Sequence, residues 1–327
     1  MSLNLHLLRL FATVVRTGSF SRAADTLRIS QPAISKGVRD FELQVGCRLL
    51  DRMPKGVRPT REGEALARHA EALFAVERDA EDELLSLRNL DSGSLRIGAS
   101  TTIATYMMAR YLDIFHRNYP AIDLHLISAN TRDVAGLIRA HDIDIALVEG
   151  LVEDDDLARK AWRTDVMNLI VCPSHRFASS EGPVDCGALR EELLIVREPG
   201  SGSREIVAQA LSNNGVEPRK ILEIGSTEAI KQAVAAGIGA SIVSTATIDD
   251  QIRLGRLKMI PMRDMRIERT LWQLKAAGRI EMPAALAFER IIRQDGKCPV
   301  NGISSEQRLA RLRSQIPQRN RLRGPEP

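Results

Sequence analysis

Side chains that could contact a nucleic acid gather in the segment around residues 30–39. Gln31 and Ser35 can each donate and accept hydrogen bonds, and Lys36 and Arg39 can reach a guanine edge or a phosphate. A helix that begins here would carry these groups on the turns that enter a DNA major groove. Proline is tolerated in such a first turn, because its missing N–H would have no partner there. The predicted DNA-contacting residues of this segment are Ser30, Gln31, Pro32, Ser35, Lys36 and Arg39.

A second group of basic side chains surrounds the turn 53–56, between segments 48–52 and 57–60 that are predicted to pair as a small hairpin. The basic residues of this hairpin, which suit phosphates or a minor groove, are Arg52, Lys55 and Arg58. In the first 63 residues eleven basic side chains face five acidic ones, whereas the net charge of the whole chain is only +4. This basic end indicates a polyanionic partner, with simple solvation as the alternative for each charge taken singly.

Three short helices are predicted to position these groups. Apolar residues recur at helical spacing over 7–14, and Thr17-Gly18 ends that helix. A second helix is predicted over 21–27, with Ser19 or Ser21 as its cap. The third helix ends at Gly46, and its predicted core residues are Ile34, Val38 and Phe41. Two helices joined by so short a turn form a helix-turn-helix, and the hairpin after them would be its wing.

A long helix is predicted from about residue 62 to residue 89, with Thr60 as its cap. Apolar residues repeat every seven positions along it or lie beside that repeat, namely Leu66, Leu73, Val76, Ala80, Leu84 and Leu87. So narrow an apolar seam on so long a helix is typical of pairing with a second copy. Packing on its own chain is the alternative.

Strands and helices alternate beyond the break at Asp91-Ser92-Gly93-Ser94. Strands are predicted over 95–98, 123–127, 143–148, 167–172, 193–196, 220–224, 240–243, 258–261 and 269–274. Helices are predicted over 103–119, 132–140, 204–213, 228–236 and 283–294. Such alternation favours an α/β architecture with mainly parallel sheets, here divided into two lobes with a cleft between them.

Residues 5–63 resemble the DNA-binding domain of the LysR-type transcriptional regulators. The specific pattern F-x-x-V-x-x-x-G-S-F-[ST]-x-A-A-x-x-L-x-x-[ST]-Q-[PS]-A-[IV]-S is intact from Phe11 to Ser35. Leu50 stands where the family usually has phenylalanine and Pro59 where leucine is common, and both concern the packing of the wing. The resemblance continues to about residue 294. It implies a long linker helix, an effector region of two α/β lobes like a type 2 periplasmic binding protein, and dimers that assemble into tetramers.

In this resemblance the effector lies between the lobes, where strands meet helix N-termini. Free N–H groups at such termini favour an anion, although each hydroxyl taken singly could be a plain helix cap. The candidate effector-binding residues are Ser100, Thr101, Thr102, Thr131, Arg197, Gly200, Ser201, Gly202, Ser203 and Thr227. The segment Arg197–Arg204, with the sequence REPGSGSR, resembles the branch that regulates carbon fixation and sulfur assimilation. That branch indicates a small anion or carboxylate without naming it.

Other classes of protein fit the sequence less well. The six histidines are scattered without an H-E-x-x-H motif, and no G-x-S-x-G elbow, Walker loop or complete dinucleotide fingerprint is present. The four cysteines are far apart without C-x-x-C spacing. We therefore predict no enzyme, no metal site and no cofactor. A periplasmic solute-binding protein is the other alternative, but the N-terminal segment lacks the features of a signal peptide and no stretch suits a membrane span. The predicted location is the cytoplasm.

The sequence thus predicts four regions: a winged helix-turn-helix over 1–61, a dimerising linker helix over 62–91, a two-lobed effector domain over 92–295 and a basic, disordered tail over 296–327. A dimer would place two recognition helices in successive major grooves of an interrupted palindrome in double-stranded DNA. The effector would shift the arrangement of lobes or subunits through its differential affinity for two states. RNA polymerase is a further candidate partner.

Overall fold

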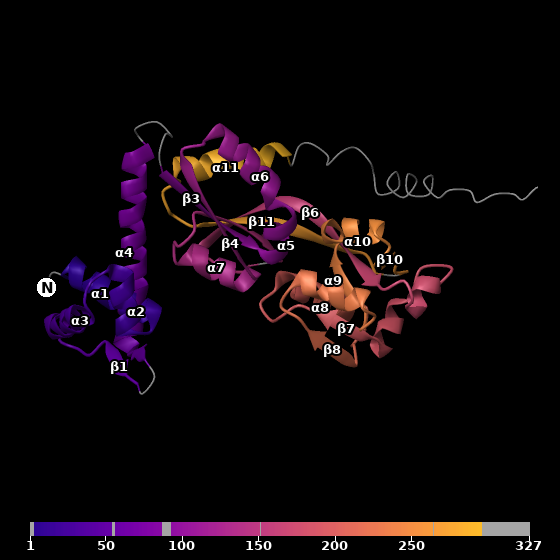
Figure 1. Cartoon of the computed structure of the whole chain (residues 1–327), viewed down its shortest axis with the longest axis horizontal. Helices are drawn as coiled ribbons and strands as arrows, with labels where there is room; N and C mark the ends of the chain where they lie inside the picture. The colour runs from indigo at the N-terminus through magenta and orange to yellow at the C-terminus, as the bar shows by residue number, and fades with distance from the viewer. Residues whose placement is uncertain (1–2, 54–55, 87–92, 151, 264, 296–327) are drawn as a thin grey trace, which may run out of the picture.

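The computed structural model describes residues 3–53, 56–86, 93–150, 152–263 and 265–295. At its N-terminal end three helices and a hairpin form one unit (Figure 1). These elements are α1 (Leu5–Thr17), α2 (Phe20–Leu27), α3 (Gln31–Val45), β1 (Leu50–Arg52) and β2 (Val57–Pro59). Gly18 and Gly46 end α1 and α3 as predicted, because both adopt left-handed φ angles, of 63° and 76°. Of the two serines considered as the cap of α2, Ser19 accepts the N–H of Arg22.

One apolar core holds this unit together. Phe11 and Phe41 are fully buried, and their ring centroids lie 6.0 Å apart between α1 and α3. Ile34 and Val38 are buried beside them, which confirms the predicted inner face of α3. With these apolar side chains turned inward, the polar side chains of the same helix are left on its outer face.

Backbone N–H groups of the wing and of its base donate hydrogen bonds to the helical part of this unit. The N–H of Val57 donates to the carbonyl of Gly18 at 3.1 Å. The carboxylate of Glu42, on α3, accepts the N–H groups of Leu49 and Leu50 at 2.8 and 3.1 Å. These contacts fix the hairpin relative to α3, so that both elements can meet one ligand surface.

A single helix, α4 (Arg61–Ser86), extends away from the N-terminal unit (Figure 1). Thr60 caps it by accepting the N–H of Gly63 at 3.0 Å, as predicted. One face of the helix turns to the unit, where Phe74 packs into the core and the guanidinium of Arg9 lies 4.2 Å from its ring centroid. On the predicted seam, by contrast, Leu73, Val76 and Leu84 are exposed.

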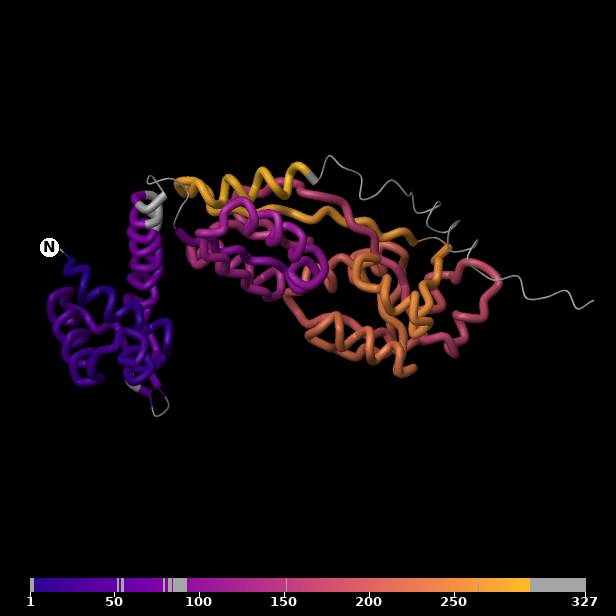
Figure 2. Tube along the Cα trace, turned by 45° about the horizontal axis from the view of Figure 1, so that its top comes forward, coloured from indigo at the N-terminus to yellow at the C-terminus, as the bar shows by residue number. Residues whose placement is uncertain are grey.

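The remainder of the chain forms two α/β lobes. The first contains β3 (Gly93–Ser100), α5 (Thr101–Tyr106), α6 (Met108–Asn118), β4 (Ile122–Ala129), α7 (Thr131–Arg139), β5 (Ile145–Glu149) and α11 (Pro283–Asp295). The second contains η1 (Arg176–Ser179), η2 (Cys186–Glu191), β7 (Leu193–Val196), α8 (Gly202–Asn213), β8 (Lys220–Glu223), α9 (Thr227–Ala235), β9 (Ser241–Ser244), η3 (Thr245–Thr247), α10 (Asp249–Arg253) and β10 (Lys258–Ile260). Two long strands, β6 (Leu157–Val171) and β11 (Ile267–Ala276), run from one lobe into the other (Figure 2).

The strands of the two lobes form a mixed sheet rather than a mainly parallel one, so that part of the prediction is wrong. The order is β10-β6-β11-β5-β3-β4, with β9 also paired to β6. Only the β3–β4 and β3–β5 pairs in it are parallel, and β7 pairs with β8 in a separate parallel sheet. The reason is that β6 and β11 cross between the lobes in opposite directions, which makes their pairing with each other and with their neighbours antiparallel.

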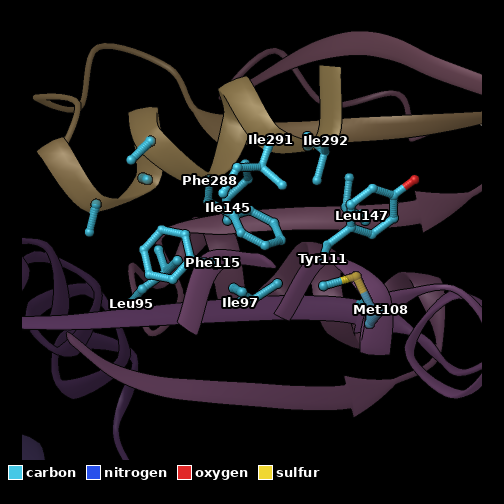
Figure 3. Packing of buried hydrophobic residues seen from close by; sticks show 14 of the residues in the cluster. Leu95, Ile97, Met108, Tyr111, Phe115, Ile145, Leu147, Phe288, Ile291 and Ile292 are labelled. Atoms are coloured by element: carbon cyan, nitrogen blue, oxygen red, sulfur yellow. The ribbon is translucent and has the colours of Figure 1, made fainter. Parts of the chain in front are cut away.

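Each lobe has its own apolar core. In the first lobe Phe115 of α6 meets Phe288 of α11 edge to face, with ring centroids 5.8 Å apart, and both pack onto strands β3 and β5 (Figure 3). The core of the second lobe gathers around Leu169, Leu194 and Ile242. The two cores are separate, and β6 and β11 are the strands that run between them.

Two further predictions differ from the structure or lie outside it. The helix predicted over 103–119 is divided into α5 and α6, because Met107 leaves helical geometry at φ −122° and turns its side chain into the core. The predicted linker end, 87–91, and the tail, 296–327, lie outside the described residues. The four predicted region boundaries therefore stay predictions.

Candidate functional site

The outer face of α3 carries the side chains predicted to read DNA. Of the six predicted residues on this helix and its cap, Ser30, Gln31, Pro32, Lys36 and Arg39 are exposed and Ser35 is half-buried. Polar groups therefore cover the first turns of the helix on the side opposite the core. This arrangement can place amide, hydroxyl and cationic groups against base edges at one time.

The wing adds positive charge beside α3. The side chain of Arg58 is exposed on β2, while Arg48 at the base of the wing pairs with Asp51 at 3.6 Å. Lys55 and the side chain of Arg52 lie outside the described residues, so their predicted contacts stay predictions. A basic hairpin fixed next to a helix of this polarity suits the phosphates that flank a major groove.

A small cavity of about 20 Å³, which is room for about one water molecule, opens in the second lobe at its border with the first. Four predicted effector residues line it, Thr102, Arg197, Ser203 and Thr227. Thr102 comes from α5 of the first lobe, and the other three come from the second lobe. Its remaining lining is apolar apart from Arg204, Ser241 and Ser244. The cavity therefore combines a few polar groups with an apolar wall, as small-molecule sites do.

Arg197 is the central cation of this cavity, and only 6% of it is exposed. Its Nη1 donates to the hydroxyl of Thr227 at 3.1 Å, and its Nη2 donates to the hydroxyl of Thr101 at 3.2 Å. Since Thr101 begins α5 and Thr227 begins α9, the guanidinium joins helix N-termini of both lobes. A planar guanidinium at this place can bind a carboxylate, phosphate or sulfate through two parallel hydrogen bonds.

Other predicted effector residues form a tight joint between the lobes instead of lining the cavity. The backbone N–H of Gly202 donates to the hydroxyl of Thr131 at 3.3 Å, and the N–H of Arg132 donates to the carbonyl of Gly200 at 3.1 Å. Gly202 is required here, because a Cβ at this position would lie 2.1 Å from the carbonyl oxygen of Glu149. The N-terminus of α8 thus rests directly on α7 and β5.

Two predicted effector serines are buried at helix starts. Ser100 precedes α5 and Ser201 precedes α8, and each is 2% exposed. Neither side chain caps its helix. The hydroxyl of Ser100 has no hydrogen-bond partner among the described residues. A buried hydroxyl without a partner costs free energy. A ligand or water at this end of β3 would therefore be stabilised by a hydrogen bond with Ser100.

A buried charge cluster behind the cavity was not predicted from the sequence. Arg269 on β11 contacts Asp165 at 2.8 Å and Glu149 at 3.1 Å, and it donates to the hydroxyl of Ser203 at 2.7 Å. Ser244 donates to Asp165 at 2.8 Å. The cluster connects the end of β5, the two crossing strands and the cavity wall. No apolar run marked Arg269 in the sequence, since Glu268 and Thr270 flank it in β11.

A second polar contact between the lobes was also not predicted from the sequence. The hydroxyl of Tyr106 on α5 donates to Glu228 on α9, and Lys231 pairs with the same carboxylate at 2.5 Å. The ammonium of Lys231 lies 4.8 Å from the ring centroid of Tyr106 and donates to the carbonyl of Thr247. Tyr106 sits one turn after Thr102, so this contact between the lobes borders the cavity.

Comparison with known proteins identifies the class to which this fold and these surfaces belong. A family model for the bacterial regulatory helix-turn-helix protein, lysR family, matches residues 5–64, and a model for the LysR substrate binding domain matches residues 88–297. The chain therefore belongs to the LysR family. It is a DNA-binding transcriptional regulator with an effector-binding domain and not an enzyme.

Individual members of the family show which regulators this chain resembles. The chain is 30% identical to the RuBisCO operon transcriptional regulator of Allochromatium vinosum, over 89% of this chain and 96% of that one. The regulatory domain of Synechocystis PCC6803 CcmR, solved in complex with 2-PG, is 28% identical with a TM-score of 0.59 and covers 63% of this chain and 99% of that one. A full-length OxyR variant from Pseudomonas aeruginosa shares the fold, with a TM-score of 0.70 at 22% identity, over 92% of this chain and 96% of that one.

The described residues hold neither a grouped set of metal ligands nor a membrane-spanning helix. No three histidine, cysteine, aspartate or glutamate side chains among them are grouped as a metal ion would require. None of the described helices is long and apolar enough to cross a membrane.

Proposed function

We propose that this regulator senses a small anion in the cavity between its lobes and that Arg197 binds the anion. The observation that carries the proposal is the buried guanidinium of Arg197, which is hydrogen-bonded to Thr101 and Thr227 from opposite lobes. An anion bound there would contact both helix N-termini at once, and each of them favours negative charge. Closing the lobes around it would give the differential affinity that ligand control requires.

The remaining effector candidates divide into two proposed roles. Thr102, Ser203 and Thr227 would complete the binding site because they line the cavity, and Ser100 would join them because its buried hydroxyl has no partner among the described residues. Thr131, Gly200, Ser201 and Gly202 would hold the lobes in register through the joint at α8. The CcmR regulatory domain, described with 2-PG, supports a small-molecule ligand, and the RuBisCO operon regulator supports the carbon-fixation branch. Both are relatives, so 2-PG is the first compound to test and not an assigned effector.

The DNA-binding proposal places α3 in the major groove, with Gln31 and Ser35 at base edges and Lys36, Arg39 and the wing on phosphates. Pairing of α4 through Leu73, Val76 and Leu84 would form the dimer, since these side chains are exposed in one chain. Two N-terminal units in one dimer suit an interrupted palindrome, and two dimers would form the tetramer. The proposed regions are 1–61, 62–91 and 92–295. RNA polymerase as partner and the bacterial cytoplasm as location complete the proposal.

A gel-shift titration on the DNA upstream of the chain's own gene tests this function. We expect a shift that survives competitor DNA and weakens steeply between two salt concentrations, because bound phosphates release counterions. Addition of 2-PG, phosphate or sulfate should change the affinity or mobility of the complex for the wild-type protein and not for Arg197→Gln. The matched control is Arg219→Gln, an exposed arginine of the second lobe that pairs with Glu191. No specific shift, or an equal response of Arg197→Gln, would refute the proposal.

A further inference from the structure

The guanidinium of Arg197 is already occupied by a carboxylate from its own chain. Glu198, the next residue, accepts from Nε at 2.8 Å and from Nη2 at 2.9 Å. These are the two parallel hydrogen bonds through which arginine binds carboxylates and phosphates. An anionic ligand therefore cannot form that bidentate contact along this edge of Arg197 while Glu198 stays in place.

Arg197 and Glu198 differ in how firmly their surroundings hold them. Arg197 is fixed, because it is 6% exposed and its other N–H groups donate to Thr101 and Thr227. Glu198 is the more accessible partner, with 23% of its side chain exposed. Among the described residues its carboxylate oxygens are hydrogen-bonded to Arg197 alone. A small rotation of the glutamate side chain toward solvent would thus free the guanidinium without breaking another contact of that carboxylate.

We propose that Glu198 is a built-in competitor that an anionic effector must displace from Arg197, an inference that rests on the proposed function. The exchange replaces one charge-assisted bidentate pair by another, so the buried guanidinium is never left without a counter-charge. Neutral ligands and ligands with a single acceptor atom cannot make this exchange. The site therefore selects anions with at least two oxygens spaced as in a carboxylate, phosphate or sulfate, and it binds them more weakly than an open guanidinium would.

The test compares Glu198→Gln with the wild-type full-length chain, with inorganic phosphate and sulfate as the probes. A carboxamide has no charge to neutralise Arg197, so each anion should bind the variant at least tenfold more tightly. Binding is measured as the Kd fitted to the rise of Tm with anion concentration at constant ionic strength, since the stabilisation grows as RT ln(1 + [L]/Kd). Glu191→Gln is the matched control, because Glu191 pairs with the exposed second-lobe Arg219 at 2.8 Å and neither residue lines the cavity. It should respond like the wild type.

Two more variants keep the outcome decisive. Arg197→Gln/Glu198→Gln carries a neutral pair and should lose the response gained by Glu198→Gln. If Glu198→Gln lacks native circular dichroism, Glu198→Asp is measured instead, since its shorter carboxylate reaches the fork less well. It should fall between the wild type and a tenfold gain. An affinity of Glu198→Gln for the anions that is equal to or lower than that of the wild type would overturn the inference. The same criterion applies to Glu198→Asp where that variant is measured instead.

Failure of the inference and failure of the proposed function give different results. Tighter phosphate and sulfate binding by Glu198→Gln, together with DNA complexes that ignore every tested anion, would support the competitor and refute the proposed function. An anion-dependent DNA complex with unchanged binding by Glu198→Gln would do the reverse. In that case the effector binds without displacing Glu198.

Discussion

Replacement of Arg269 by methionine should destabilise the effector domain more than any other single change in the buried charge cluster. The arginine side chain is 1% exposed and lies between Glu149, at 3.1 Å, and Asp165, at 2.8 Å. Methionine fills much of the same volume but leaves two buried carboxylates without a cation. Removal of one partner from a buried pair costs about 3–5 kcal/mol, because the remaining charge is no longer compensated.

Glu149→Gln is the informative comparison. It leaves Arg269 paired with Asp165, one cation for one anion. The new carboxamide oxygen can still accept from Ser203, whose hydroxyl lies 2.5 Å from the Glu149 carboxylate in the wild type. The expected loss is about 1–2 kcal/mol, the range for weakening a buried hydrogen bond. The ratio of the two losses tests whether net charge or contact number controls the stability of this cluster.

Urea unfolding followed by tryptophan fluorescence suits this test. Both tryptophans of the chain, Trp162 and Trp272, lie on the crossing strands β6 and β11, so the signal reports on the effector domain and not on the DNA-binding head. Arg266→Met is the control, since that side chain is 78% exposed and should change stability by less than about 0.5 kcal/mol. A loss below about 1 kcal/mol for Arg269→Met, or one no larger than for Glu149→Gln, would refute the reasoning.

Three other results are expected. Gln31→Ala should relax base preference in a binding-site selection. Arg58→Ala should weaken binding to all DNA sequences alike and lower the slope of log affinity against log salt concentration by about one. Equal sequence preference in wild type and Gln31→Ala would show that α3 is misplaced. Val76→Glu should raise the dimer dissociation constant at least tenfold in sedimentation equilibrium, since one charge would enter the proposed seam twice, while Leu254→Glu, exposed on the second lobe, should leave it unchanged. Burial alone would raise the pKa of Glu289. The hydrogen bond from Lys275 and the positive charges of Lys275 and Arg293 lower it by more, so the pKa lies below its ordinary value of 4.5. The stabilisation is therefore present above pH 4.5 and lost as pH falls through the lowered pKa, and Glu289→Gln should differ from the wild type in urea unfolding at pH 7 but little in strong acid.

The N-terminal unit could be predicted closely because its signals are local. Gly18 and Gly46 end helices through their own φ angles, and the burial of Ile34, Val38 and Phe41 follows from spacing within one helix. The exposure of Gln31 and Arg39 then follows from the same periodicity, because the opposite face is apolar.

Strand direction and the contacts between the lobes could not be predicted in the same way, because they depend on contacts between distant segments. The antiparallel pairing of β11 with β6 joins residues about one hundred positions apart, such as Arg269 and Asp165. The same pairing buries Arg269 beside Glu149. Likewise, Thr131 and Thr227 read as similar strand-to-helix junctions, and only the packing of α8 onto α7 assigns Thr131 to the joint between the lobes while Thr227 lines the cavity.

The most direct test of the central claim is a footprint of the full-length chain on its upstream DNA, with and without each candidate anion, for wild type and Arg197→Gln. We expect a protected interrupted palindrome whose extent or bending changes with one anion in the wild type and stays fixed in Arg197→Gln. A footprint that changes equally in both proteins would mean that the effector binds elsewhere. A footprint that responds to no anion would contradict an anion-sensing cavity at Arg197.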